Sequence, residues 1–136
     1  NNLAKMSPVN IIKPNDELSS DVPLIWSTRR SLEHWHTGTM TRRAVVLNEL
    51  EPDPMIFMNK VDSNFYNLNL NKSVIIETRR GKISIKIRHD DDLLPGMIFL
   101  PFCFKEAAAN ILTNSDLDPI GKIPELKFSA ARVYQN

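Results

Sequence analysis

Apolar residues along the chain fall in short runs separated by polar and proline-containing stretches. The clearest pattern follows residue 73, where the run Val74–Thr78 leads through Arg79-Arg80-Gly81 to Ile83, Ile85 and Ile87, which alternate with polar residues. Alternation with a period of two is typical of a strand with one buried and one solvated face, and a short polar break between two such runs is typical of a hairpin. The pattern predicts a β-hairpin with one solvated face.

Other apolar runs are also short enough to be strands. We expect them at Leu24–Trp26, Met55–Met58, Met97–Leu100 and from about Leu126 to Tyr134. The dipeptide Pro95-Gly96 marks the turn into the third of these runs, because proline and glycine are the strongest local turn formers.

Three segments have helical character, namely Ala44–Leu50, a stretch from Asn59 to about Tyr66, and Glu106–Leu112. Asn59 is a suitable N-cap for the second segment, because an asparagine side chain accepts from the first free backbone N–H groups of a helix. Helical spacing then places Val61, Phe65 and Leu68 on the buried side.

Several short strands with only brief helices between them predict a mostly β fold, a compact β-barrel with short helices. A parallel βαβ sheet is disfavoured, because its crossover connections need about a dozen or more residues each. Residues 1–22 are polar and contain prolines, so we interpret them as a lead-in or linker, and residues 23–136 as the domain.

The composition is that of an ordinary globular domain. The chain has 136 residues, 42% of them hydrophobic and 24% charged, with a formal net charge of +1. This excludes a disordered chain or a collagen, and the charge offers no global field for nucleic acid or an anionic membrane. No apolar run approaches the roughly 20 residues of a membrane-spanning helix. The first residue is Asn rather than Met, so we expect a piece of a longer polypeptide.

The densest concentration of functional side chains is the segment Thr28–Arg43. It holds four arginines, two histidines, one tryptophan, one acidic residue and a run of hydroxyls. Guanidinium groups suit phosphate oxygens, and a flat ring suits a base or another π-system. Composition alone leaves two interpretations open: a nucleotide site, or a buried Trp35 with solvated arginines.

His34 and His36 could share one face if this segment were a strand. They could then bind zinc, with His89, Cys103 or a carboxylate as a third ligand, but no spacing supports such a ligand and we predict no metal site in this chain. A hydrolase is disfavoured as well, because the chain has no GxSxG motif.

Two further segments carry candidate chemistry. The basic hairpin around Arg79 and Arg80 could contact nucleic acid or a protein, but no aromatic residues alternate with its charges, and a solvated strand edge is the favoured interpretation. In the segment from Phe102 to Asn114, small residues before Asn110 would let a ligand approach an amide that both donates and accepts. Cys103 lies between two phenylalanines and is interpreted as a buried apolar residue.

The order of these motifs is similar to that in a known family. The run LEHWHTGTMTRR at 32–43 with LNELEP at 47–52 resembles the C-terminal molybdopterin dinucleotide-binding domain of molybdenum- or tungsten-dependent formate dehydrogenases and periplasmic-type nitrate reductases. The tail EAAANILTN at 106–114, with LDP at 117–119 and GKIPE at 121–125, resembles the formate dehydrogenase branch, most of all its NAD-linked catalytic subunit. The resemblance covers about residues 8–134.

The resemblance implies a double-psi β-barrel that covers one side of a bis-(molybdopterin guanine dinucleotide) cofactor. The cofactor-binding positions that it implies are Thr28, Arg29, Arg30, Ser31, Leu32, Glu33, His34, Trp35, His36, Thr37, Phe102, Asn110 and Lys127. It also implies that the metal's protein ligand and the iron–sulfur cysteines lie in upstream domains, and that this chain alone catalyses nothing. The implied partners are those domains and iron–sulfur or flavin subunits that reduce NAD, in the cytoplasm, with neither nucleic acid nor membrane.

Two positions depart from the family pattern. Arg29 stands where many relatives have glycine, beside the implied contact to the diphosphate, so its side chain either adds a phosphate partner or points away. Asn71-Lys72 replaces a common Gly-Asp in the turn before the hairpin, and asparagine tolerates the left-handed conformation that such turns use.

Overall fold

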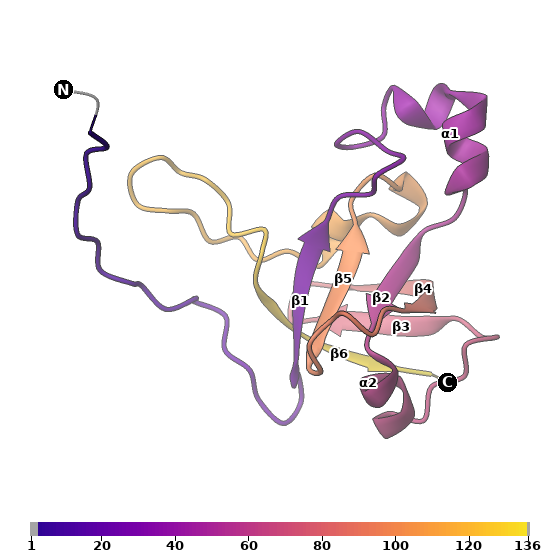
Figure 1. Ribbon diagram of the computed structural model, residues 1–136. Helices are drawn as coiled ribbons and strands as arrows, with labels where there is room; N and C mark the ends of the chain where they lie inside the picture. Colours follow the sequence, from indigo (N-terminus) through magenta and orange to yellow (C-terminus); the bar gives the residue numbers. More distant parts are fainter. Residues whose placement is uncertain (1–2, 136) are drawn as a thin grey trace.

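The computed structural model describes residues 3–135 (Figure 1). Its elements in chain order are β1 (Leu24–Arg29), η1 (Thr41–Arg43), α1 (Val45–Leu50), β2 (Met55–Met58), α2 (Lys60–Phe65), β3 (Val74–Thr78), β4 (Lys82–His89), β5 (Met97–Pro101), η2 (Lys105–Ala107), η3 (Ala109–Ile111) and β6 (Ser129–Tyr134), where η denotes a 3-10 helix. Within this range no helix is long and apolar enough to cross a membrane.

The strands form a closed barrel in the order β1-β5-β2-β4-β3-β6. Two neighbouring pairs, β1 with β5 and β2 with β4, are parallel, and the other four pairs are antiparallel. The chain reaches each parallel neighbour only after passing through other strands of the barrel. The predicted mostly β barrel with short helices is confirmed, and its crossing parallel pairs fit the double-psi arrangement.

Alternate residues of the strands fill the interior of the barrel. Trp26, Ile56, Ile76, Ile98 and Leu100 are completely buried. Burial of each such side chain contributes roughly 1.5–3 kcal/mol relative to exposure. The predicted hairpin is present as β3 and β4, whose paired residues include Ile76 and Ile83, and its outer face is exposed.

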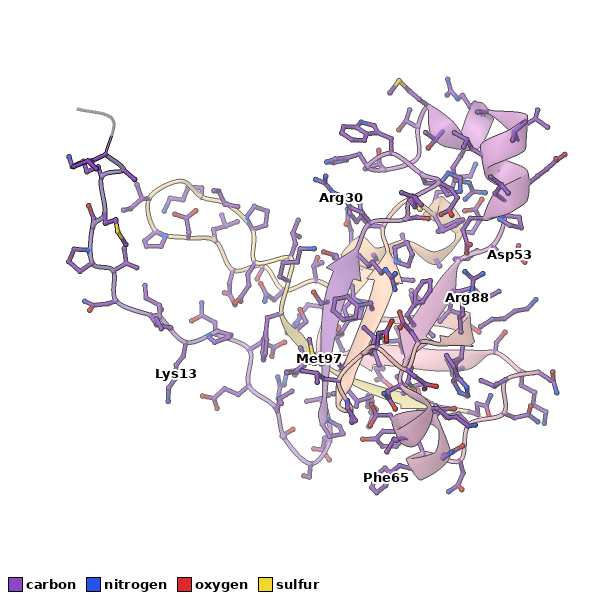
Figure 2. The ribbon with its side chains drawn as sticks, viewed as in Figure 1. Lys13, Arg30, Asp53, Phe65, Arg88 and Met97 are labelled. Carbon is purple, nitrogen blue, oxygen red and sulfur yellow. The ribbon has the colours of Figure 1, made fainter. Side chains whose placement is uncertain are left out.

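The buried side predicted for α2 is wrong at Val61 and Phe65, although its cap is right and the predicted Leu68 is partly buried against the core. The Asn59 side chain accepts from the Val61 N–H at 2.8 Å, but Val61 and Phe65 are 61% and 75% exposed, and Figure 2 shows Phe65 pointing away from the barrel. The helix instead buries Asp62, whose carboxylate accepts from the Gly96 N–H at 2.7 Å. A polar contact to the turn before β5 therefore decides how this short helix sits.

The predicted helix over Glu106–Leu112 is also wrong, because the segment forms two 3-10 turns, η2 and η3. Ala108 lies between them in an extended conformation with a ψ of 100°. Ala107, Ala109 and Leu112 are buried in the core cluster. Packing of these residues on the barrel thus prevails over the helical propensity of an alanine run.

Residues 3–23 contain no helix or strand, as expected of a lead-in, but they are attached to the barrel through Asp16, Glu17 and the buried Val22. The Asp16 carboxylate is buried and accepts from Arg79, from Arg80 and, at 2.8 Å, from the Ala130 N–H. Charged hydrogen bonds of this kind are roughly twice as strong as neutral ones. The interpretation of this segment as a linker alone is therefore incomplete.

Candidate functional site

The candidate site is the loop that leaves the barrel after β1, together with the residues that fix both of its ends (Figure 1). Thr28, near the end of β1, is buried, and its carbonyl accepts from the Lys127 ammonium at 2.7 Å. Lys127 comes from the segment before β6, the strand that pairs with β1. The closed barrel thus brings two of the predicted cofactor-binding residues into contact.

The Arg29 guanidinium contacts other residues of the chain. Its guanidinium donates to Asp90 at 2.9 Å and lies 4.4 Å from the centre of the Phe57 ring. Arg88 lies 5.4 Å from the same ring and donates to Glu51 at 2.9 Å. The structure shows neither of the two orientations that the sequence leaves open for Arg29, because its guanidinium is paired with a carboxylate of the chain itself.

Arg30 differs from its neighbour, because it is exposed and has no carboxylate partner among residues 3–135. It lies where the loop leaves β1 (Figure 2), and its guanidinium is 6.0 Å from the centre of the Trp35 ring. Trp35 is 62% exposed, so the interpretation of this tryptophan as core is wrong. A free guanidinium and an exposed flat ring are the groups that a nucleotide site requires.

The two histidines do not share a face. His34 is buried, with its Nε2 hydrogen-bonded to the Glu51 carbonyl at 2.8 Å and its ring edge against Phe104. Because a carbonyl only accepts, this Nε2 carries the proton. His36 has a φ of 51°, and its ring meets Phe102 edge to face at 5.3 Å. The strand geometry assumed for a zinc pair is therefore absent, and His34 is a structural anchor of the loop.

The loop backbone supplies donors for an anion. Within residues 3–135, the N–H groups of Ser31 and Leu32 donate to no protein acceptor, whereas the N–H of Glu33 is paired with that residue's own carboxylate and the N–H of Trp35 donates to the Thr41 hydroxyl at 3.0 Å. The Ser31 hydroxyl instead donates to the Glu33 carboxylate at 2.7 Å and is the main cause of that group's lowered pKa. Successive free backbone N–H groups form concave sites for anions.

Two hollows flank this loop. A hollow of about 160 Å³ is lined by Arg29, Arg30, Ser31, Leu32, Glu33, Glu51, Phe57, Arg88 and Pro101. A larger one of about 380 Å³ is lined by Thr37, Gly38, Thr39, Arg42, Arg43, Cys103, Lys105 and Glu106. Sequence reasoning omitted Phe57, Arg88 and Lys105 from the site. Phe57 and Arg88 lie in β2 and β4, which β5 joins to β1, and Lys105 follows β5.

One predicted site residue does not join this group. Asn110 is exposed in η3 and lines neither hollow, while its neighbour Ile111 lies against Gly81 at the tip of the hairpin. Phe102 is in place through its contact with His36. The structure therefore gathers the loop, Phe102 and Lys127, and the position of Asn110 in the site stays a prediction.

A fold and a site of this kind define a class of cofactor-binding β-barrel. Residues 24–130 match the family described as "Molydopterin dinucleotide binding domain", and this chain belongs to that family. Membership indicates the bis-(molybdopterin guanine dinucleotide) cofactor of molybdenum and tungsten enzymes.

More particular similarities are to large subunits. The chain is 39% identical over 133 residues to the F420-dependent formate dehydrogenase subunit alpha of Methanocaldococcus jannaschii, covering 98% of this chain and 20% of that protein. It is 33% identical over 124 residues to the periplasmic nitrate reductase of Campylobacter fetus, covering 90% of this chain and 13% of that protein. The chain thus spans a fifth or less of the length of these relatives.

A solved structure supports the fold. The barrel superposes on acetylene hydratase from Pelobacter acetylenicus with a TM-score of 0.73, at 20% sequence identity, over 85% of this chain and 18% of that one. At this identity the likeness concerns the fold alone.

The residues of the loop fit the anionic part of such a cofactor. The free Arg30 guanidinium, the free backbone N–H groups of Ser31 and Leu32 and the exposed Trp35 ring supply the charge, hydrogen-bond donors and flat surface that a nucleotide diphosphate and a ring system require. Cys103 is the chain's one cysteine, and burial raises its pKa to about 11. It is thus a poor metal ligand, and an iron–sulfur cluster would need cysteines from elsewhere.

Proposed function

We propose that this chain is the cofactor-binding C-terminal domain of a molybdenum- or tungsten-dependent formate dehydrogenase alpha subunit, and that residues 23–136 are the domain proper. The observation that carries the proposal is the loop after β1, which Lys127 holds at Thr28 and in which the Arg30 guanidinium and the N–H groups of Ser31 and Leu32 have no hydrogen-bond partner within residues 3–135. The metal of the bound cofactor supplies the redox chemistry, and the chain supplies binding and orientation.

In this proposal the residues of the loop have different tasks. Arg30 and the N–H groups of Ser31 and Leu32 bind the diphosphate, Glu33 holds the Ser31 hydroxyl, and Trp35 stacks on a ring of the dinucleotide. Thr28 and His34 fix the backbone of the loop, and His36 with Phe102 forms an apolar wall that continues to Thr37. Arg29 lines the smaller hollow, where Asp90 and Phe57 hold its guanidinium in place.

Two residues from outside the loop complete the set. Lys127 places positive charge under the root of the loop, because its ammonium has two further N–H donors beyond the one on Thr28. The Asn110 side chain in η3 forms a hydrogen bond with a polar edge of the cofactor. For this contact the cofactor must extend beyond the two hollows.

Formate as the substrate is supported by the names of the archaeal relatives. Reduction of nitrate is the second candidate, because nitrate reductases reach 33–34% identity and cover most of this chain. We infer cytoplasmic partners, iron–sulfur or flavin subunits that pass electrons to NAD. The names of the archaeal relatives favour coenzyme F420 as the alternative acceptor.

The test of the activity uses the full-length subunit with its natural partners. We expect bound molybdenum or tungsten and formate-dependent reduction of NAD or F420, assayed separately to identify the acceptor. Turnover with nitrate and a reduced dye in the absence of formate oxidation would replace the proposed substrate.

The test of the site compares two variants of the same subunit. Arg30→Ala removes the free guanidinium and should lower metal and guanine-nucleotide content at least several-fold, while the circular dichroism spectrum stays unchanged. Lys86→Ala removes an exposed charge on the outer face of β4 and should leave cofactor content as it is. Full cofactor content in Arg30→Ala would remove this residue from the site.

A further inference from the structure

The larger hollow does not include Arg30 in its lining, and apart from Thr37 the proposed function does not use the residues that line it. It lies between the segment Thr37–Arg43 and the start of η2, and its volume is about 380 Å³. Binding sites for small molecules occupy roughly 300–1,000 Å³. The hollow is therefore larger than a single phosphate or formate ion needs.

Positive charge dominates its lining. Arg43 and Lys105 are exposed, and within residues 3–135 neither forms an ion pair or a side-chain hydrogen bond. The third cation, Arg42, donates to Glu106 at 2.8 Å and to Asn48 at 3.1 Å. Glu106 is the one carboxylate of the lining, so the charges of Arg43 and Lys105 remain uncompensated.

The walls of the hollow are held in place before any ligand arrives. Arg42 lies 4.6 Å from the centre of the Phe104 ring in addition to its two hydrogen bonds. A Cβ atom added to Gly38 would come 2.7 Å from the Cys103 carbonyl oxygen, so the loop lies directly on the segment after β5. A preformed site loses less conformational entropy on binding.

Hydroxyl groups complete the donor set at the mouth. The Thr37 and Thr39 hydroxyls are 3.1 Å apart and exposed. Hydroxyls, an arginine fork and a lysine point charge are complementary to phosphoryl oxygens. The thiol of Cys103 takes no part, because burial raises its pKa to about 11 and keeps it protonated.

From these observations we propose that this hollow is a second anion site, and that it binds the diphosphate group of a nucleotide, with Arg43 and Lys105 as the two cations. Two uncompensated cations suit two adjacent phosphoryl groups, and the volume leaves room for the attached sugar. The diphosphate belongs to a free nucleotide, separate from the dinucleotide cofactor of the family. The proposal does not require the Arg30 site.

The first experiment titrates the 136-residue chain with GDP and with inorganic pyrophosphate at constant ionic strength, followed by 15N-resolved NMR. We expect saturable shifts at Thr37, Thr39, Arg43 and Lys105. The double variant Arg43→Ala/Lys105→Ala should raise the dissociation constant at least ten-fold and keep the dispersed spectrum of the folded barrel.

The matched control is Lys82→Ala/Lys86→Ala, which removes the same charge from the exposed face of β4. It should change the dissociation constant less than two-fold. Equal weakening by both double variants, equal affinity for formate or sulfate, or no saturable binding would each overturn the proposal.

A second experiment separates this site from the cofactor site of the proposed function. In the full-length subunit, Arg43→Ala/Lys105→Ala should keep normal metal content and lose GDP binding, whereas loss of metal content would assign the hollow to the dinucleotide cofactor and overturn the proposal. The proposed function fails independently if Arg30→Ala leaves metal content unchanged.

Discussion

The ammonium of Lys127 donates a 2.7 Å hydrogen bond to the Thr28 carbonyl, across 99 residues of sequence. This contact joins the last turn before β6 to the root of the candidate site. It orders the loop and at the same time brings a positive charge to the end of the barrel. Lys127 is thus a positioning residue as well as a candidate ligand contact.

Replacing Lys127 by methionine keeps the apolar stem and removes the ammonium. We expect a loss of about 1–2 kcal/mol in the free energy of unfolding, because a charged hydrogen bond to a half-buried carbonyl is removed. Denaturant unfolding measures this loss, and hydrogen exchange should become faster in residues 28–37. Lys86→Met, on the exposed face of β4, should change neither quantity, and slow exchange in Lys127→Met would contradict the positioning role.

The Asp16 contact gives a pH prediction. Burial raises the pKa of this carboxyl, but hydrogen bonds from Arg80 and the Ala130 N–H, with the charges of Arg80 and Arg79, more than offset it, so the pKa lies below its ordinary value of 3.8. The folded chain therefore favours the carboxylate. The resulting stability is fully present above the ordinary value and is lost as the pH falls through the lowered pKa.

We accordingly expect Asp16→Asn to lower the free energy of unfolding at pH 7 by about 1–3 kcal/mol and to flatten its decline below pH 4. Thermal unfolding between pH 2 and pH 7 measures both effects. The exposed Asp53 offers a control, since Asp53→Asn should leave the curve unchanged. An unchanged slope in Asp16→Asn would show that the carboxylate gains nothing from folding.

The interior of the barrel allows a test of the β4 register. Ile85 is 4% exposed and Ser84 beside it is exposed. Ile85→Asp buries an unpaired charge and should destabilise the domain by about 4 kcal/mol or more, enough to unfold it. Ser84→Asp should change stability by less than about 0.5 kcal/mol, and similar circular dichroism melts for the two variants would refute the register.

Two glycines with positive φ allow the cost of backbone strain to be measured apart from the cost of a steric clash. Gly38 has a φ of 76° and its added Cβ would meet the Cys103 carbonyl oxygen at 2.7 Å, whereas Gly96 has a φ of 88° with no atom within 4 Å. Both alanine variants incur backbone strain of order 1–3 kcal/mol. We expect Gly38→Ala to be the less stable of the two in urea unfolding. Equal midpoints would mean that the loop moves away from β5 without loss.

Local patterns in the sequence predicted the elements whose neighbours are close in sequence. The alternation of Ile83, Ile85 and Ile87 sufficed for the hairpin, because one face is solvated and the other packs inward. The Asn59 cap is equally local. The alanine-rich segment failed for the opposite reason, since its conformation is decided by the barrel surface on which Ala107 and Ala109 pack.

The part of the candidate site that the sequence predicted is also the part that is local in sequence. Its loop is one continuous segment with an unusual composition, so Arg30 and Trp35 could be named from the sequence. The stacking of Arg29 and Arg88 on Phe57 depends on strand neighbours that a crossing topology determines. The resemblance to a family supplied Phe102 and Lys127, which no local pattern connects with the loop.

The helix α1 and the turn η1 contain no buried residue, although the barrel beside them is completely packed. A chain with this arrangement can gain, lose or replace residues between Ala44 and Leu50 without opening the strand pairs that close the barrel, since exposed connections tolerate insertions. The sequence of this exposed segment can therefore change faster than the sequence of the barrel strands. Exchanging the segment between homologous subunits should alter the surface next to the barrel while the barrel itself is retained.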